Sequence, residues 1–140
     1  MLRVNDIRQL FIDNQNEDLE TNEILGQSFI ADEATIFGKL NKEYVQAEIA
    51  WYKSESLNVN DLQPTPKIWE MISSITGFIN SNYGNLIYSH ARGRQYEMVK
   101  CELEANPNSR RAVMIYNRPT MHTEYNINGM SDFVCTNAVQ

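Results

Sequence analysis

The chain has 140 residues, 42% of them hydrophobic, and a formal net charge of −6 at pH 7. This length suits one domain or part of one, and the acidic balance argues against nucleic-acid or anionic-membrane binding, because both need a basic face. No apolar run approaches the roughly 18 residues of a membrane span, and charges recur through the first 20 residues, so we expect neither a membrane span nor a signal peptide.

The first half of the chain predicts two helices with a loop and a strand between them. Residues 4–12 place apolar side chains at helical spacing. An acidic loop follows, DNQNEDLETN, and the next ten residues, EILGQSFIAD, are typical of a strand, with Gly26 at a bulge or a close backbone approach. Residues 40–54 predict a helix with a broad apolar face. Pro64 and Pro66 then mark an extended link into KIWEMISS.

The second half predicts a shaped loop, a helix and two strands. The loop is GFINSNYGN, because Gly and Asn tolerate left-handed conformations. The helix spans residues 94–105 and ends at Asn106 and Pro107. Its apolar side chains share one side: Tyr96, Val99 and Leu103. A buried strand, AVMIY, and an alternating strand, DFVCTNAVQ, are separated by a turn at Asn128-Gly129.

Helices that alternate with strands indicate an α/β or α+β layered domain. Only three strands are clear, and the third lies at the very end of the chain. We therefore expect a sheet that is incomplete toward the C-terminus and that needs more chain or a second polypeptide.

The two cysteines, Cys101 and Cys135, lack CxxC spacing, so we expect neither a zinc site nor a disulfide framework, and the pattern favours a reducing cytoplasm. Cys101 has no basic cluster beside it, and we interpret it as structural. For Cys135 one interpretation is a buried thiol that behaves as a small hydrophobe. The other is a nucleophile, which needs a nearby positive charge, and Arg110-Arg111 is the only paired arginine in the chain.

Four polar residues are candidates for binding or proton transfer. Arg110 and Arg111 follow Ser109, and the three could form a solvated strand-edge group or a clamp for one small anion such as a phosphate. Glu48 lies in an otherwise apolar stretch, VQAEIAWY. It could face solvent from an amphipathic helix, or face a pocket and relay protons through water.

Aromatic and imidazole side chains carry weaker signals. Trp51, Trp69 and Tyr83 are of a type found more often in a core than in a ligand platform. His90 and His122 have no ligand spacing with Cys, Asp or Glu, so we assign them neither metal binding nor a base role, and we predict no metal site.

Six stretches, taken together and in order, indicate a protein family: FIADEATIFGKLNKEY, AEIAWYKSESL, TPKIWE, INSNYGN, NPNSRRAVMIYNRP and GMSDFVCTNAVQ. They cover residues 20–140 and resemble the thymidylate synthase superfamily, most closely the deoxycytidylate (dCMP) hydroxymethylases of bacteriophages. The SRR element with a cysteine about two dozen residues later is specific to the superfamily, and the MSDFVCTN form points to the hydroxymethylase branch. The resemblance implies a thymidylate synthase-like fold, with a mixed sheet covered by helices, and implies that residues 1–140 are the N-terminal portion of a single domain of this fold.

The resemblance also implies an activity, deoxycytidylate 5-hydroxymethyl transfer from 5,10-methylenetetrahydrofolate to carbon 5 of dCMP with addition of water, in the cytoplasm of a phage-infected bacterial cell. Cys135 would be the nucleophile that adds to carbon 6 of the pyrimidine. Glu48 would organise the water for its addition and for proton transfer. Trp69 would line the folate site, and Tyr83 would lie in the active-site wall near Cys135.

The same resemblance implies a homodimer. Arg110 and Arg111, with Ser109, would bind the nucleotide phosphate of the partner subunit across the dimer interface. The family carries a basic residue in the loop before its first strand, whereas this loop, NQNEDLETN, has no Lys or Arg.

The resemblance also implies that the residues that choose between cytosine and uracil lie outside this sequence, so alternatives stay open. One is a thymidylate synthase or a dUMP hydroxymethylase. Another is a truncated or split fragment that only binds nucleotide, or that needs a complementary C-terminal polypeptide. A small α/β module that binds a nucleotide without chemistry is a third. We expect the chain alone to show no hydroxymethyl transfer.

Overall fold

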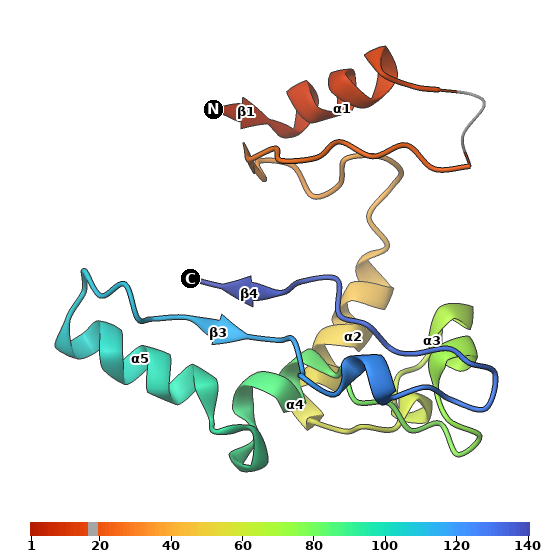
Figure 1. Ribbon diagram of the computed structural model, residues 1–140, viewed down its shortest axis with the longest axis vertical. Helices are drawn as coiled ribbons and strands as arrows, with labels where there is room; N and C mark the ends of the chain where they lie inside the picture. Colours follow the sequence, from red (N-terminus) through yellow and green to blue (C-terminus); the bar gives the residue numbers. More distant parts are fainter. Residues whose placement is uncertain (17–19) are drawn as a thin grey trace. The chain divides into compact units, whose positions relative to one another are not determined.

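The computed structural model describes residues 1–16 and 20–140. The acidic loop predicted over residues 13–22 therefore lies partly outside the described residues. The chain divides into two compact units, Met1–Lys42 and Glu43–Gln140, whose elements are labelled in Figure 1. Every candidate site residue named above lies in the second unit.

The described residues of the first unit form three short elements: β1 (Leu2–Arg3), α1 (Val4–Asp13) and β2 (Phe29–Ile30). Helix α1 confirms the prediction over residues 4–12, and it buries Val4 and Ile7. The two strands pair in parallel. Asp32 joins them to the helix, because its carboxylate accepts hydrogen bonds from the Val4 backbone N–H at 3.1 Å and from Arg3 at 2.8 Å. These two hydrogen bonds lower the pKa of Asp32.

The strand predicted over residues 23–32 is wrong in extent, because only Phe29 and Ile30 form β2. The pairing stops where the Asp32 backbone N–H bonds back to the Ile30 carbonyl at 3.0 Å, which turns the chain. Gly26 has a φ of 69°, and a Cβ built there would meet nothing within 4 Å. This glycine therefore serves a left-handed turn and not a close backbone approach.

The second unit is mainly helical. Its elements in chain order are α2 (Lys42–Ser54), η1 (Val59–Asp61), α3 (Lys67–Ile72), α4 (Tyr83–Tyr88), η2 (His90–Arg92), α5 (Gln95–Ala105), β3 (Met114–Ile115), η3 (Met121–Thr123) and β4 (Ala138–Val139). The helices predicted over residues 40–54 and 94–105 are confirmed as α2 and α5. None of the helices in the described part of the chain is long and apolar enough to cross a membrane.

The core of this unit is a cluster of four buried side chains: Trp51, Val59, Leu62 and Ile79. Trp51 comes from α2, and its indole N–H donates to the Asn58 carbonyl at 3.0 Å, so its one polar atom is satisfied. Burying each such side chain contributes on the order of 1.5–3 kcal/mol. The apolar face predicted for α2 is narrower than expected, because Ile49 is 46% exposed.

Helix α4 corrects the prediction that residues 77–85 form a loop throughout. Asn82 caps α4 by accepting the Asn85 backbone N–H at 3.0 Å, and its amide donates to the Trp51 and Ser56 carbonyls. The glycine in this helix, Gly84, allows α4 to lie directly on the end of α2. A Cβ at Gly84 would stand 1.6 Å from the Tyr52 carbonyl oxygen.

Strands β3 and β4 form an antiparallel pair, with Met114 opposite Val139 and Ile115 opposite Ala138. The strands predicted over residues 112–116 and 132–140 are thus correct in place but too long. The expected burial of the first strand also fails at Ile115, which is 56% exposed. Each strand has one partner among the described residues, so one edge of each stays unpaired.

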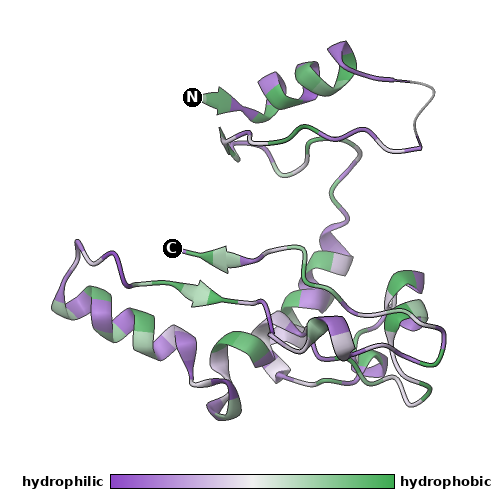
Figure 2. Cartoon of the chain, viewed as in Figure 1, coloured by the Kyte–Doolittle hydropathy of each residue, from purple (hydrophilic) through white to green (hydrophobic). Residues whose placement is uncertain are grey.

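The mixed helix and strand content of the prediction is confirmed. The single mixed sheet is not found in the described residues, which form two separate two-stranded sheets. The thymidylate synthase-like fold and the single-domain assignment of residues 1–140 remain predictions. Helix α5 runs alongside β3 (Figure 1), and its polar and apolar residues alternate along its length (Figure 2).

Candidate active site

The structure brings Tyr83 and Cys135 together. Tyr83 is the first residue of α4, directly after the Asn82 cap. Its hydroxyl oxygen accepts the backbone N–H groups of Cys135 at 3.0 Å and of Thr136 at 3.1 Å. Cys135 is exposed, so the interpretation of a buried, hydrophobe-like thiol is wrong for this chain.

Glu48 lies on one face of α2 between two tyrosines at helical spacing, Tyr44 and Tyr52. The Tyr44 hydroxyl donates to the Glu48 carboxylate at 2.7 Å. Burial and this hydrogen bond raise the pKa of Tyr44 to about 12. Burial, the Glu48 charge and a hydrogen bond to Glu48 raise the pKa of Tyr52 as well. Glu48 is therefore half-buried and held by two phenols, and it does not lie on a solvated helix face.

Aromatic contacts connect Glu48 to Cys135. The Tyr52 ring packs edge-on against Tyr83, with ring centroids 5.5 Å apart. Tyr83 in turn packs edge-on against Tyr116 at 5.2 Å. Because the Tyr83 hydroxyl holds the Cys135 backbone, a continuous set of contacts runs from the carboxylate to the cysteine segment.

Trp69 lies at the other end of the same set of contacts. It is on α3, its ring packs edge-on against Trp51 at 5.4 Å, and its indole N–H points to the Tyr44 hydroxyl at 3.4 Å. The residues expected to serve catalysis and folate binding are thus connected within one unit. Their roles stay predictions.

Ser109 and Arg111 are held by Glu102 of α5. The Ser109 hydroxyl donates to Glu102 at 2.5 Å, and the Arg111 guanidinium donates to the same oxygen at 3.2 Å. The Ser109 hydrogen bond and the Arg111 charge lower the pKa of Glu102, against a smaller opposing effect of burial. The Arg111 side chain is 83% exposed, and exposed pairs of this kind contribute only about 0–1 kcal/mol. An incoming phosphate could therefore replace Glu102 at little cost.

Arg110 contacts the last residue of the sequence. The Gln140 amide donates to the Arg110 carbonyl at 3.2 Å, and Gln140 is five positions after Cys135. The expectation that the arginine pair provides the positive charge beside the thiol remains a prediction.

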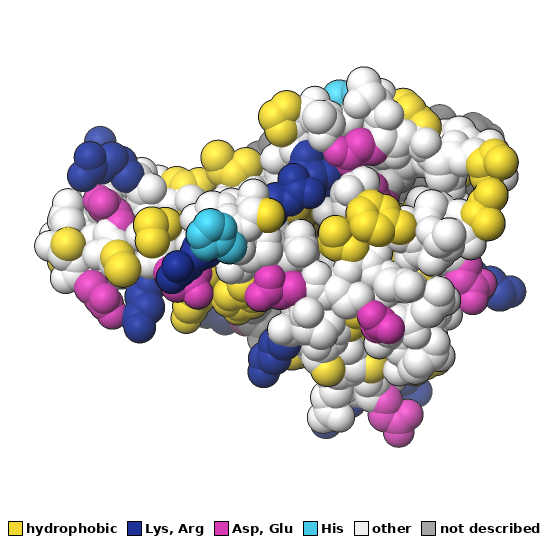
Figure 3. Space-filling view, turned by 90° about the horizontal axis from the view of Figure 1, so that it is seen from below, with side chains coloured by type: hydrophobic (Ala, Val, Ile, Leu, Met, Phe, Trp, Pro, Cys, Tyr) yellow, Lys and Arg dark blue, Asp and Glu magenta, His cyan; other side chains and the backbone are white. Residues whose placement is uncertain are grey.

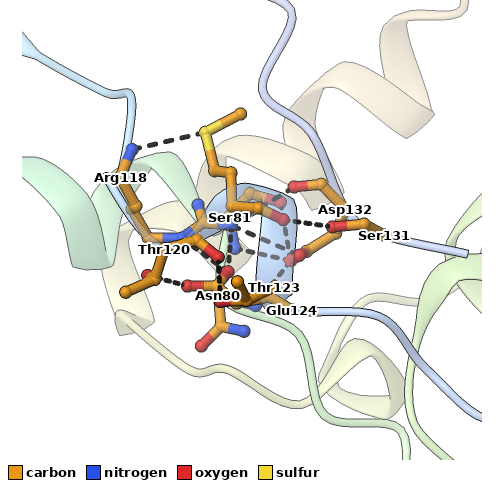
Figure 4. Close-up of polar contacts among 9 residues, drawn as sticks. Asn80, Ser81, Arg118, Thr120, Thr123, Glu124, Ser131 and Asp132 are labelled. Atoms are coloured by element: carbon orange, nitrogen blue, oxygen red, sulfur yellow. Dashed lines mark hydrogen bonds and ion pairs between the residues drawn. The ribbon is translucent and has the colours of Figure 1, made fainter.

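A buried charged cluster around Arg118 was missed by the sequence interpretation (Figure 4). The Arg118 and Asp132 side chains are each 4% exposed and form an ion pair at 3.3 Å. Arg118 also donates twice to Glu124, at 2.8 and 3.0 Å. Burial raises the pKa of Glu124, but the hydrogen bonds from Arg118 and Thr120 lower it overall. An aspartate directly before the apolar residues of FVC was the signal that could have indicated the cluster.

Comparison with curated proteins gives clear relatives. The chain is 56% identical over 123 residues to the deoxycytidylate 5-hydroxymethyltransferases of Enterobacteria phages T4, T2 and T6. The match covers 87% of this chain and 50% of each phage protein, so the chain spans about half the length of the curated relatives it matches. No family model matches the chain. The expected resemblance to phage deoxycytidylate hydroxymethylases is confirmed.

Proposed function

We propose, from the relation to the phage deoxycytidylate 5-hydroxymethyltransferases, that this chain carries the nucleophile of a dCMP hydroxymethylase. The observation that carries the proposal is the set of contacts joining the exposed Cys135 to Glu48 through Tyr83 and Tyr52. The enzyme would act in the cytoplasm of the phage-infected bacterial cell. A thymidylate synthase or a dUMP hydroxymethylase would use the same set of residues, so the choice of base is tested below.

Cys135 would begin the reaction by adding its sulfur to carbon 6 of the pyrimidine. This addition makes carbon 5 nucleophilic, so that carbon 5 would attack the one-carbon unit. The folate amine and the carbon 5 proton would then leave, water would add to the exocyclic methylene group, and the cysteine sulfur would be released. The covalent adduct thus divides one difficult step into easier ones. The backbone of the cysteine segment is fixed on the Tyr83 hydroxyl. Such fixing favours attack, because it reduces the conformational freedom lost on reaching the reactive geometry.

Glu48 would hold the water that completes the product. Its carboxylate accepts hydrogen bonds from Tyr44 and Tyr52, and a carboxylate in this setting can orient a water and accept a proton from it. 5,10-Methylenetetrahydrofolate would supply the one-carbon unit. Trp69 and the Tyr44 hydroxyl next to it offer an aromatic ring and a polar atom of the kind that a pterin ring can contact.

The arginine pair would bind the phosphate of a nucleotide in a partner subunit. Arg110 and Arg111 are exposed, so both side chains are accessible to a partner subunit across a homodimer interface. Among the described residues the Arg110 guanidinium makes no ion pair. It is therefore available for a phosphate oxygen.

The test is tritium release from carbon 5 of labelled dCMP, with a polypeptide equivalent to the rest of a phage enzyme supplied. We expect release with the unchanged chain, and loss of at least about 10³-fold with Cys135→Ser, the size seen when a nucleophile is removed. Cys101→Ser is the matched control, because Cys101 is also an exposed thiol. Release that survives Cys135→Ser would contradict the mechanism.

Two further arms separate the alternatives. Labelled dUMP in place of dCMP tests base choice, and the 140-residue chain alone should give no transfer. A fragment that only binds nucleotide would bind dCMP, lose binding with Arg110→Ala and be indifferent to Cys135→Ser.

A further inference from the structure

Asp132 occupies a position from which it can control the cysteine segment. It lies three residues before Cys135 and is 3% exposed. One of its carboxylate oxygens accepts three hydrogen bonds: from the Asn80 backbone N–H at 2.5 Å, from the Ser81 backbone N–H at 2.8 Å and from the Ser81 hydroxyl at 2.9 Å. The other oxygen faces Arg118, as Figure 4 shows.

The same two segments are joined a second time at Tyr83. Asn80 and Ser81 lie just before α4, and Tyr83 begins it. The Tyr83 hydroxyl accepts the backbone N–H groups of Cys135 and Thr136. Residues 80–83 and 132–136 are therefore linked at both ends, with the carboxylate of one segment and the phenol of the other as the two acceptors.

Arg118 is held in place by its own partners. Its guanidinium donates to Glu124 and to Asp132, and its backbone N–H lies 3.3 Å from the Met121 sulfur. One guanidinium nitrogen, Nη1, is buried without a hydrogen-bond partner among the described residues. A buried unsatisfied donor is unfavourable, and a buried ion pair is weak evidence for stability but a recognised means of specifying one arrangement. The cluster is thus better explained by positioning than by stability alone.

We infer that Asp132, oriented by Arg118, is a positioning residue that fixes the backbone of Cys135 against Tyr83. The inference rests on the proposed function in one respect, since a fixed cysteine segment matters for chemistry when Cys135 is the nucleophile. Replacing the carboxylate by an amide presents an N–H donor to Arg118 or to the backbone donors of residues 80 and 81. The segment should then open more often.

Amide hydrogen exchange of the complete 140-residue chain, measured residue by residue by NMR, tests this inference. With Asp132→Asn we expect exchange at Cys135 and Thr136 to accelerate by at least about fivefold, because the loss of hydrogen bonds makes local opening of the segment more favourable. Asp61→Asn is the matched control: Asp61 accepts an exposed hydrogen bond from Ser56 at 2.5 Å, and its replacement should leave both rates unchanged. Tyr83→Phe removes the acceptor itself and sets the upper limit of the effect.

A purely structural role for Asp132 predicts a different pattern. Exchange would then accelerate at Asn80 and Ser81 only, with Cys135 and Thr136 unchanged, and that result would overturn the inference. If Asp132→Asn does not fold, Ser81→Ala decides, because it removes only one of the three donors; we expect about twofold acceleration at Cys135 and Thr136. Exchange needs no turnover, so a failure here is distinguishable from a failure of the transfer assay.

Discussion

The second unit contains one region with a buried apolar core and one region whose helix and strands bury much less. The closed region, residues 43–89, buries Trp51 and Leu62 to 2% exposure or less and seals α4 against α2. The open arm, formed by α5, β3 and β4, has no buried residue in its helix. Leu103 of that helix is 40% exposed, and Ile115 of β3 is 56% exposed.

The difference shows which apolar surfaces of the second unit are covered by its own residues and which are not. In the open arm, the predicted apolar side of α5 lines a shallow hollow together with β3, and nothing in the second unit covers it. The hollow is lined by Tyr96, Val99, Lys100, Leu103, Glu104 and Met114. On the face drawn in Figure 3, apolar side chains lie in separate groups between acidic and basic ones, without a continuous basic surface.

The largest effect is expected where the closed region has least space. Gly84→Ala would place a methyl group 1.6 Å from the Tyr52 carbonyl oxygen, and backbone cannot yield as a flexible side chain can. We expect the free energy of unfolding to fall by roughly 3–5 kcal/mol or the chain not to fold, measured by urea denaturation.

Gly93→Ala is the matched change beside the open arm. Gly93 has a φ of 84°, but a Cβ there would meet nothing within 4 Å. The cost should be limited to the left-handed backbone, about 1 kcal/mol. Equal costs for the two glycines would contradict the view that α4 and α2 meet in backbone contact.

These glycines also show what the sequence could predict and what it could not. Helices α2 and α5 were predictable because their apolar spacing is local. Helix α4 was missed because its Asn and Gly residues are typical of a loop, whereas here Asn82 is a cap and Gly84 allows a close contact with residues 32 positions earlier. The close contact at Gly84 is not visible without the partner helix.

The candidate site likewise contains one contact that could be predicted and one that could not. A tyrosine near Cys135 followed from the family resemblance, and the structure places Tyr83 there. The link between Asp132 and Ser81 spans 51 residues, and no spacing rule predicts such a contact. Strand ends were overestimated for a related reason: β-propensity indicates that a strand can form, and the partner strand decides how far it extends.

A smaller decrease in the free energy of unfolding is expected at alkaline pH, and we assign it to Tyr44 in the closed region. The pKa of Tyr44 is raised from 10.0 to about 12 by burial and by the hydrogen bond to Glu48. Since the folded-state pKa is above the unfolded value, this group contributes stability that is fully present below about pH 10 and is lost as pH rises toward 12. Ultraviolet titration of tyrosinate with parallel urea denaturation measures both.

Tyr44→Phe is the control for this titration. The variant should lose part of the alkaline decrease in stability while keeping the ring packing against its neighbours. An unchanged alkaline decrease in Tyr44→Phe would assign it to other tyrosines, Tyr52 first, whose pKa is also raised by burial and by Glu48.

The smallest effect on the free energy of unfolding is expected from a leucine-to-alanine substitution in the open arm, compared with the same change in the closed region. Leu62→Ala removes a side chain with 0% exposure and should cost about 2–5 kcal/mol. Leu103→Ala removes one that is 40% exposed, so little apolar area returns to water and no enclosed cavity forms; we expect less than about 1 kcal/mol. Urea denaturation at several protein concentrations separates the two cases. If Leu103→Ala costs as much as Leu62→Ala, and its cost grows with concentration, the open arm is covered by a second molecule in solution and the contrast between the regions belongs to the isolated chain alone.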